Sequence, residues 1–200
     1  MEQPRDPPMS RIAEPRIAAS RIAPLEPPYA PDIQEQFDRI MRGAPPLLLF
    51  RVMAGHPRAW EKFRAASLLD RGPLTLRERE IVIDRTCALN QCEYEWGVHV
   101  AIFAQAAHLT DEQVRATVTE GAEAPCWSEA ERVLIAAVDA LHHRATLDDA
   151  EFAALSARYD DAQILEIMLL CGFYRTVAYL ANGLALPLEP NAARFPAVPA

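Results

Sequence analysis

Four side chains within a twenty-residue stretch have the types and the spacing that acid–base or thiol chemistry needs. Cys92, Glu95 and His99 follow one another at offsets of three and four residues, so a helix would place all three on one stripe. On the preceding predicted helix, Glu80 is embedded in the apolar run 81–83. An unpaired polar group costs about 1–3 kcal/mol in apolar surroundings. We therefore expect these four side chains to partner one another, to do chemistry, or both.

The chemistry open to this group is acid–base, thiol-dependent or metal-dependent. His99 suits a general acid because its unperturbed pKa is about 6.5, and Glu95 or Glu80 would orient it or relay its proton. A thiolate at Cys92 would attack a peroxide. Bundles that bind two metal ions repeat a Glu-x-x-His motif, whereas this chain has a single Glu-x-x-x-His, so we predict no metal and no cofactor. The structural alternative is a buried Glu–His pair that joins two helices beside an inert thiol.

Helix signals position these residues along the middle of the chain. The Ser/Thr-x-x-Glu/Gln pattern of a capping box marks three helix starts: Thr75–Glu78, Thr110–Gln113 and Ser128–Glu131. We expect the helix that starts at Thr75 to end near a turn at Asn90, and a further helix to span about 92–107. We expect Thr146 to cap a later helix. No segment shows the period-two alternation of β-branched residues that is typical of a strand. The prediction is a single all-α domain, a helical bundle over residues 32–186.

The two ends of the sequence differ from this middle. Residues 1–31 hold eight of the seventeen prolines, which predicts an extended arm. Residues 187–200 are similar in kind and predict a C-terminal tail. The first residues carry Glu, Asp and Pro where a secretory signal has its apolar core. We therefore expect a cytoplasmic protein whose four cysteines are thiols.

Charge and hydropathy limit the partners. A net charge of -8 argues against nucleic acid, whose phosphates require clustered Lys and Arg. The segment from Ile164 to Leu184 is apolar on nearly every face, but Glu166 and Arg175 interrupt it, and a membrane span would rarely carry both. A helix that is apolar all round must be covered all round. We therefore predict no membrane partner, a homo-oligomer, and a small molecule as substrate.

The motifs in residues 76–110 resemble those of the carboxymuconolactone decarboxylase family, which includes the alkylhydroperoxidase D-like proteins. The resemblance rests on Leu76 through Glu80, on Tyr94–Trp96 with His99, and on the stretch from Ala104 to Thr110, in which His108 stands where the family commonly has Gly. It extends over residues 32–189. The family implies an all-helical fold of the alkylhydroperoxidase D-like type that assembles into trimers or hexamers. In its hydroperoxidase branch, a proton relay links a Glu, a Cys-x-x-Cys pair and a His.

By motif, the relay residues of the family fall on Glu80, Cys92 and His99, while Glu95 occupies the position of the second Cys. A thiol peroxidase needs a second thiol to resolve the sulfenic acid, and Glu95 cannot supply it. The expected function is therefore cofactor-independent decarboxylation, or a related lyase reaction, of a small carboxylated or lactone-like molecule. Two alternatives remain open: a peroxiredoxin-type hydroperoxidase with Cys92 as its peroxidatic residue and an outside resolving thiol, and a non-catalytic oligomer.

Two further residues have either a substrate-binding or a structural interpretation. Arg85 would bind a substrate carboxylate, or would form a structural ion pair beside Asp84 and Glu80. Tyr174, on the last helix, would reach the pocket if that helix packs across it, although packing alone explains its presence more simply.

Overall fold

The computed structural model describes residues 20–197, so most of the predicted N-terminal arm and the last three residues of the predicted tail lie outside the described part. Within these limits the chain forms nine α-helices, one short 3-10 helix and no strand, which confirms the predicted all-α class. The helical segments are α1 (Pro31–Met41), α2 (Leu48–Ala54), α3 (Pro57–Ala65), α4 (Leu76–Leu89), α5 (Glu93–Phe103), α6 (Asp111–Val118), η1 (Gly121–Glu123), α7 (Glu129–Arg144), α8 (Asp149–Ser156) and α9 (Asp161–Gly183).

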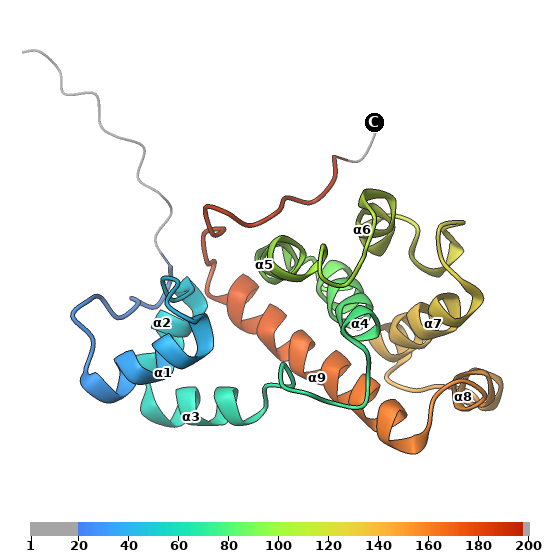
Figure 1. Cartoon of the computed structure of the whole chain (residues 1–200), viewed down its shortest axis with the longest axis horizontal. Coiled ribbons are helices and arrows are strands. Elements are labelled where there is room, and N and C mark those ends of the chain that lie inside the picture. Colours follow the sequence, from blue (N-terminus) through green and yellow to red (C-terminus); the bar gives the residue numbers. More distant parts are fainter. Residues whose placement is uncertain (1–19, 198–200) are drawn as a thin grey trace, which may run out of the picture.

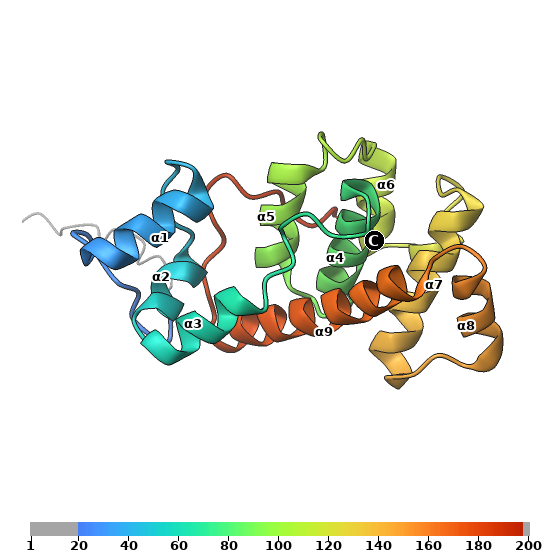
Figure 2. The same cartoon turned by 60° about the horizontal axis from the view of Figure 1, so that its bottom comes forward.

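Helix α4 is the centre of the bundle and contacts α5, α6, α7 and α9. The long helix α9 runs along the molecule from α8 at one end to the α1–α3 group at the other (Figures 1 and 2). Residues 80–87 of α4 are all buried, because neighbouring helices cover it on several sides. A polar side chain on this part of α4 must therefore find its partner inside the protein.

All three predicted capping boxes form, and Asp148 and Asp160 open α8 and α9 in the same way. The prediction that Thr146 caps α8 is wrong. Asp148 accepts the Glu151 backbone N–H at 2.8 Å, and the Glu151 carboxylate accepts the Asp148 N–H in return. Thr146 has Asp149 rather than Glu or Gln three residues later, so it lacks this reciprocal partner.

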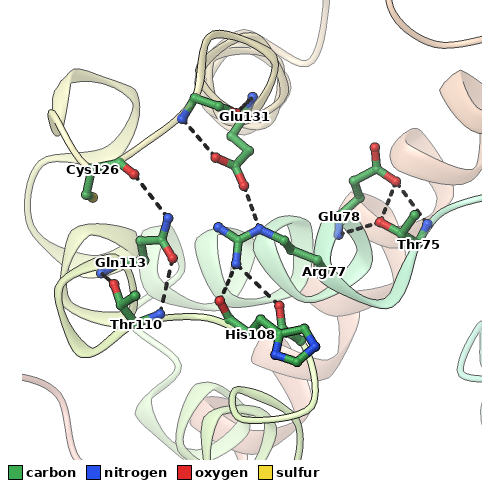
Figure 3. Close-up of polar contacts among 10 residues, drawn as sticks. Thr75, Arg77, Glu78, His108, Thr110, Gln113, Cys126 and Glu131 are labelled. Carbon is green, nitrogen blue, oxygen red and sulfur yellow. Dashed lines mark hydrogen bonds and ion pairs between the residues drawn. The ribbon is translucent and has the colours of Figure 1, made fainter.

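The chain leaves α5 through a left-handed residue, His108 (φ 54°). The Leu109 N–H donates to the Ala104 carbonyl across it at 2.9 Å, which is the Schellman arrangement that favours glycine. This geometry explains why the resemblance predicts Gly where this chain has His. Figure 3 shows Arg77 of α4 between this turn and α7, where it donates to the His108 carbonyl and to Glu131. Arg77 therefore ties the turn after α5 to the core.

The C-terminal segment lies along α5 of its own chain. The Ala193 N–H donates to the Gly97 carbonyl at 2.9 Å, and the Phe195 ring packs edge-on against Trp96 with ring centroids 5.0 Å apart. Farther back, Glu189 accepts hydrogen bonds from the Tyr94 hydroxyl and from a backbone N–H of α2. This segment covers the helix that carries Glu95 and His99.

Glycine at position 97 makes that contact possible, which leads to a prediction. A Cβ at Gly97 would lie 2.3 Å from the Ala193 carbonyl oxygen, closer than real atoms approach. We expect Gly97→Ala to lower the free energy of unfolding by about 1–3 kcal/mol, because the tail must move away from α5. The control is Gly172→Ala in α9, where an added Cβ meets nothing and where helix propensity favours alanine. Equal effects in urea titrations of the two variants would contradict the prediction.

Helix α9 is long and apolar enough to cross a membrane by length and composition, as core helices of globular domains also are. Its buried side packs against α4, α5, α7 and α8. On the opposite side, Leu165 is 62% exposed and Leu169 is 60% exposed in the single chain. Helix α9 therefore has the exposed apolar side that the sequence predicted another protein surface would have to cover. Tyr179 extends this side toward the C-terminal end of the helix.

Candidate active site

The turn between α4 and α5 brings the two halves of the predicted site together. Gln91 takes the left-handed conformation (φ 51°), and the Cys92 N–H donates to the Cys87 carbonyl at 2.9 Å across it. Asn90, the residue expected to make the turn, is instead the last residue before it. Helix α5 therefore starts one residue later than predicted, and Cys92 is its N-cap residue. Glu95 and His99 remain one turn apart on α5 and face α4.

His99 lies between the two predicted carboxylates. Its Nδ1 is 2.7 Å from Glu80 Oε2, and its Nε2 is 3.5 Å from Glu95 Oε1. The Glu80 and His99 side chains are 1% and 3% exposed, so this relay is closed off from bulk water. The Glu95 side chain is 10% exposed, and its second oxygen has no hydrogen-bond partner among the described residues. Glu95 is thus the member of the relay nearest to solvent.

Arg79 completes the charge balance of the relay. Its guanidinium donates to Glu80 Oε1 at 3.0 Å, the oxygen that His99 does not use. It also donates to the Leu69 carbonyl and lies over the Phe103 ring, 5.5 Å from the centroid. With His99 protonated, two cations face the carboxylates of Glu80 and Glu95. Such pairing is what allows charged groups to be buried at tolerable cost.

The two carboxylates hold a proton on His99. Burial alone favours the neutral imidazole, but the hydrogen bonds and charges of Glu80 and Glu95 outweigh it and raise the pKa of His99 to about 10. The Tyr174 ring meets the imidazole edge-on at 5.0 Å, so α9 does pack across the site and fixes the ring plane. At neutral pH the relay therefore contains an imidazolium that can donate a proton.

Cys92 is buried beside the relay but is not part of its hydrogen-bonded chain. Burial raises the pKa of its thiol to about 12, and the backbone N–H of Glu95 opposes that shift only in part. Burial also raises the pKa of Cys87 well above its usual value. Both residues are fully buried and free, and the backbone hydrogen bond between them keeps them adjacent. Both thiols are therefore protonated at neutral pH and poorly suited to nucleophilic attack.

Asp84 is a further buried residue beside the relay, and it was not among the residues predicted for the site. It lies one helical turn after Glu80 on α4, is 1% exposed, and neither of its carboxyl oxygens has a hydrogen-bond partner in the described structure. Burial raises its pKa well above the usual range, with the charge of His99 opposing the shift and that of Glu80 adding to it. The spacing of four residues from Glu80 was the available signal.

Arg85 has a structural partner in this chain. Its guanidinium donates to both oxygens of Asp139 on α7, at 2.6 Å and 3.0 Å, and to the Thr117 carbonyl at 2.9 Å. It does not pair with Asp84 or Glu80. A bidentate pair of this kind fixes α4 against α6 and α7, so the structural interpretation of Arg85 fits the geometry.

The model of the carboxymuconolactone decarboxylase family matches residues 54–140, a segment that includes α4, α5 and all four candidate residues. Residues 54–140 belong to the carboxymuconolactone decarboxylase family. The boundaries of this decarboxylase-family region run from the end of α2 to near the end of α7. No curated protein matches the chain.

Solved structures show the same fold over more of the chain. An uncharacterized peroxidase-related protein from Silicibacter sp. TM1040 has a TM-score of 0.76 at 19% identity and covers 94% of this chain and 100% of its own. An uncharacterized peroxidase-related protein from Ralstonia eutropha JMP134, described as an alkylhydroperoxidase AhpD core, gives 0.74 at 21% identity, covering 86% and 93%. The debrominase Bmp8 in complex with 2,3,4-tribromopyrrole gives 0.68 at 18% identity, covering 84% and 91%. The bundle around the family region is thus an AhpD-like fold.

Proposed function

We propose that this chain, whose residues 54–140 match the carboxymuconolactone decarboxylase family, is a cofactor-independent acid–base enzyme. Its reaction is the decarboxylation, or a related lyase reaction, of a small carboxylated or lactone-like molecule. The observation that carries the proposal is the position of the buried His99 ring between Glu80 at 2.7 Å and Glu95 at 3.5 Å, two carboxylates that raise its pKa. A group that carries a proton in a dry site is what protonation of a carbon requires.

The proposed steps use these residues in fixed roles. The bond between the substrate carbon and its carboxylate breaks, CO2 leaves, and the electron pair moves onto the lactone carbonyl. His99 Nε2 then delivers its proton to the carbon, and Glu80 keeps the ring oriented through Nδ1. The apolar surroundings favour CO2 departure, because a poorly solvated carboxylate loses its charge readily. Solvent returns a proton to His99 through Glu95, the relay member nearest to water.

Substrate reaches His99 from the Glu95 side in this proposal. The 3.5 Å contact between Glu95 and His99 is long for a hydrogen bond, and Glu95 keeps one oxygen without a partner. A rotation of the Glu95 side chain therefore costs less than breaking the Glu80–His99 bond. That rotation would open the space beside Nε2 in which the reacting carbon must lie.

Thiol chemistry at Cys92 is the second candidate, and the peroxidase-related descriptions of two neighbours in fold favour it. Against it stand Glu95 in place of a second thiol and a Cys92 pKa raised to about 12. We expect Cys92→Ser to keep the decarboxylation rate within about threefold, since a buried neutral thiol contributes packing rather than a proton.

The experiment compares the parent and Cys92→Ser on two substrate sets. One set is a panel of lactone acids that includes a carboxymuconolactone, followed by CO2 release, and the other is hydrogen peroxide and an organic hydroperoxide with an added thiol. CO2 release by both proteins would support the proposal. Peroxide consumption that disappears in Cys92→Ser, with no CO2 from any acid, would contradict it. Activity of neither kind in the parent would favour the non-catalytic oligomer.

We also propose that the chain forms a homo-oligomer, a trimer or a hexamer. The exposed apolar side of α9, with Leu165 and Leu169, supports this proposal because exposed apolar patches of this kind usually mark interfaces. Light scattering after size exclusion is expected to give three or six times the 22.3 kDa chain mass. Leu165→Glu is expected to shift that mass toward one chain, and a monomeric parent would contradict the proposal.

A further inference from the structure

A cavity of about 240 Å³ lies between the C-terminal ends of α4 and α7 and the middle of α9. Its walls come from the last turns of α4, from α7 around His142, and from α9 between Met168 and Arg175. None of the four candidate catalytic residues lines it. This cavity is therefore distinct from the candidate active site.

The cavity carries one charged group, the Arg175 guanidinium, and no carboxylate lines its wall. Arg175 is held in position by two bonds, from Nε to the Tyr179 hydroxyl at 2.8 Å and from Nη1 to the His142 carbonyl at 3.1 Å. Neither bond uses Nη2. A fixed guanidinium with a free edge in a partly enclosed pocket is suited to bind a carboxylate.

Two polar atoms of the wall are buried and have no hydrogen-bond partner among the described residues: Thr86 Oγ1 and His142 Nδ1. Thr86 is 3% exposed, and its hydroxyl lies close enough to the Cys171 thiol to lower the pKa of that thiol, but sulfur is a weak acceptor. Burial and the nearby Arg175 lower the pKa of His142, so its ring is neutral and free to donate from one nitrogen. Unused donors of this kind are costly unless a ligand accepts from them.

A second cavity of about 440 Å³ lies next to the first, and Leu141, Ala145 and Met168 line both. Its wall leads to Phe152, a large apolar side chain that is 45% exposed. Asp148 and Asp149 also line this second cavity, and neither lines the first. An apolar chain fits this extension, whereas a second anionic group would meet those two carboxylates.

We propose that these two neighbouring cavities bind an amphipathic monocarboxylate. Its carboxylate lies on Arg175, and its chain runs past Met168 to Phe152. Thr86 Oγ1 and His142 Nδ1 are buried in the wall, so each would donate to the carboxylate only after a rotation of its side chain. The ligand class follows from the single cation in the first cavity, the apolar residues that line both cavities, and the two carboxylates in the second. The site is independent of the decarboxylation proposed above.

Isothermal titration calorimetry of the full chain with octanoate tests this site. We expect the parent to bind octanoate saturably. We expect the parent to bind octanamide, and Arg175→Met to bind octanoate, at least about tenfold more weakly, because each change removes the charged bond. Phe152→Ala is expected to weaken octanoate while leaving the response to acetate unchanged. The matched control is Arg144→Met, the same change at an exposed residue that lines neither cavity, and it is expected to bind as the parent does.

The outcomes separate the proposal from its alternatives. Circular dichroism verifies that each variant is folded, and if Arg175→Met is not, the octanamide and Phe152→Ala measurements decide. Equal affinities for octanoate and octanamide would overturn the carboxylate assignment. No saturable octanoate binding by the parent, or an Arg175→Met variant that binds as tightly as Arg144→Met, would also overturn it. A change of oligomeric mass in Phe152→Ala without loss of octanoate binding would show that a second copy covers this surface instead.

Discussion

His99→Gln is expected to lower kcat for decarboxylation by about 10²–10⁴-fold, the usual contribution of a positioned general acid. Glutamine keeps a donor that can reach Glu80, so the buried carboxylate retains a partner, but it carries no proton that can be transferred. The measurement is CO2 release at saturating substrate and neutral pH. His143→Gln is the matched control, because His143 is exposed at the end of α7 and far along the chain from the relay.

The size and the kind of the loss both matter. A loss in kcat with KM nearly unchanged indicates a group that acts in the chemical step. A His99→Gln variant that keeps more than about a tenth of the parent kcat would remove His99 from the role of general acid. Such a result would leave the Glu80–His99 bond as a structural link between α4 and α5.

Glu80→Ala is expected to lower the free energy of unfolding by about 3–5 kcal/mol, the usual cost of leaving a buried charge without its partner. Both Arg79 and His99 lose their bonds to Glu80, and the His99 side chain, which is 3% exposed, has no water to replace that bond. Urea titration followed by circular dichroism measures the change. Glu35→Ala is the control, because its pair with Arg39 is exposed on α1, and it is expected to change stability little.

The same pair makes stability depend on pH. The folded-state pKa of His99, about 10, lies above its unfolded value of about 6.5. The stabilisation from its charge is therefore fully present below the unfolded pKa and is lost as pH rises through the folded pKa. We expect the parent to lose stability between neutral pH and about pH 10, and Glu80→Ala to lose less over that range. Parallel pH profiles for the two proteins would contradict the assigned pairing.

Local patterns in the sequence predict much of the fold and of the site. Capping boxes define the starts of α4, α6 and α7, and each one forms as expected. The spacing of Glu95 and His99 places them on one face of α5, and the motif resemblance identifies Glu80 as their partner on α4. These features depend on neighbours three or four residues apart, which helix geometry relates directly.

Long-range contacts account for what the sequence does not predict. Arg85 pairs with Asp139, which lies 54 residues later in the sequence. The C-terminal segment binds α5 through the hydrogen bond from the Ala193 N–H to the Gly97 carbonyl. The burial of Asp84 could not be predicted from the sequence pattern. Residues 80–87 are all buried, so the pattern does not separate a polar face of α4 from an apolar one. The left-handed turn falls on Gln91 rather than Asn90, since the last hydrogen bonds of α4 decide its register and not side-chain preference.

The His99 imidazole is expected to stay protonated inside the protein at neutral pH. An NMR titration of the parent labelled with ¹⁵N at its histidines measures this state through the ring nitrogen shifts. We predict that the resonances of one buried histidine remain those of an imidazolium through neutral pH, titrate near pH 10 and disappear in His99→Gln. A neutral His99 ring at pH 7, titrating near its ordinary value, would show that Glu80 and Glu95 do not hold a proton on it.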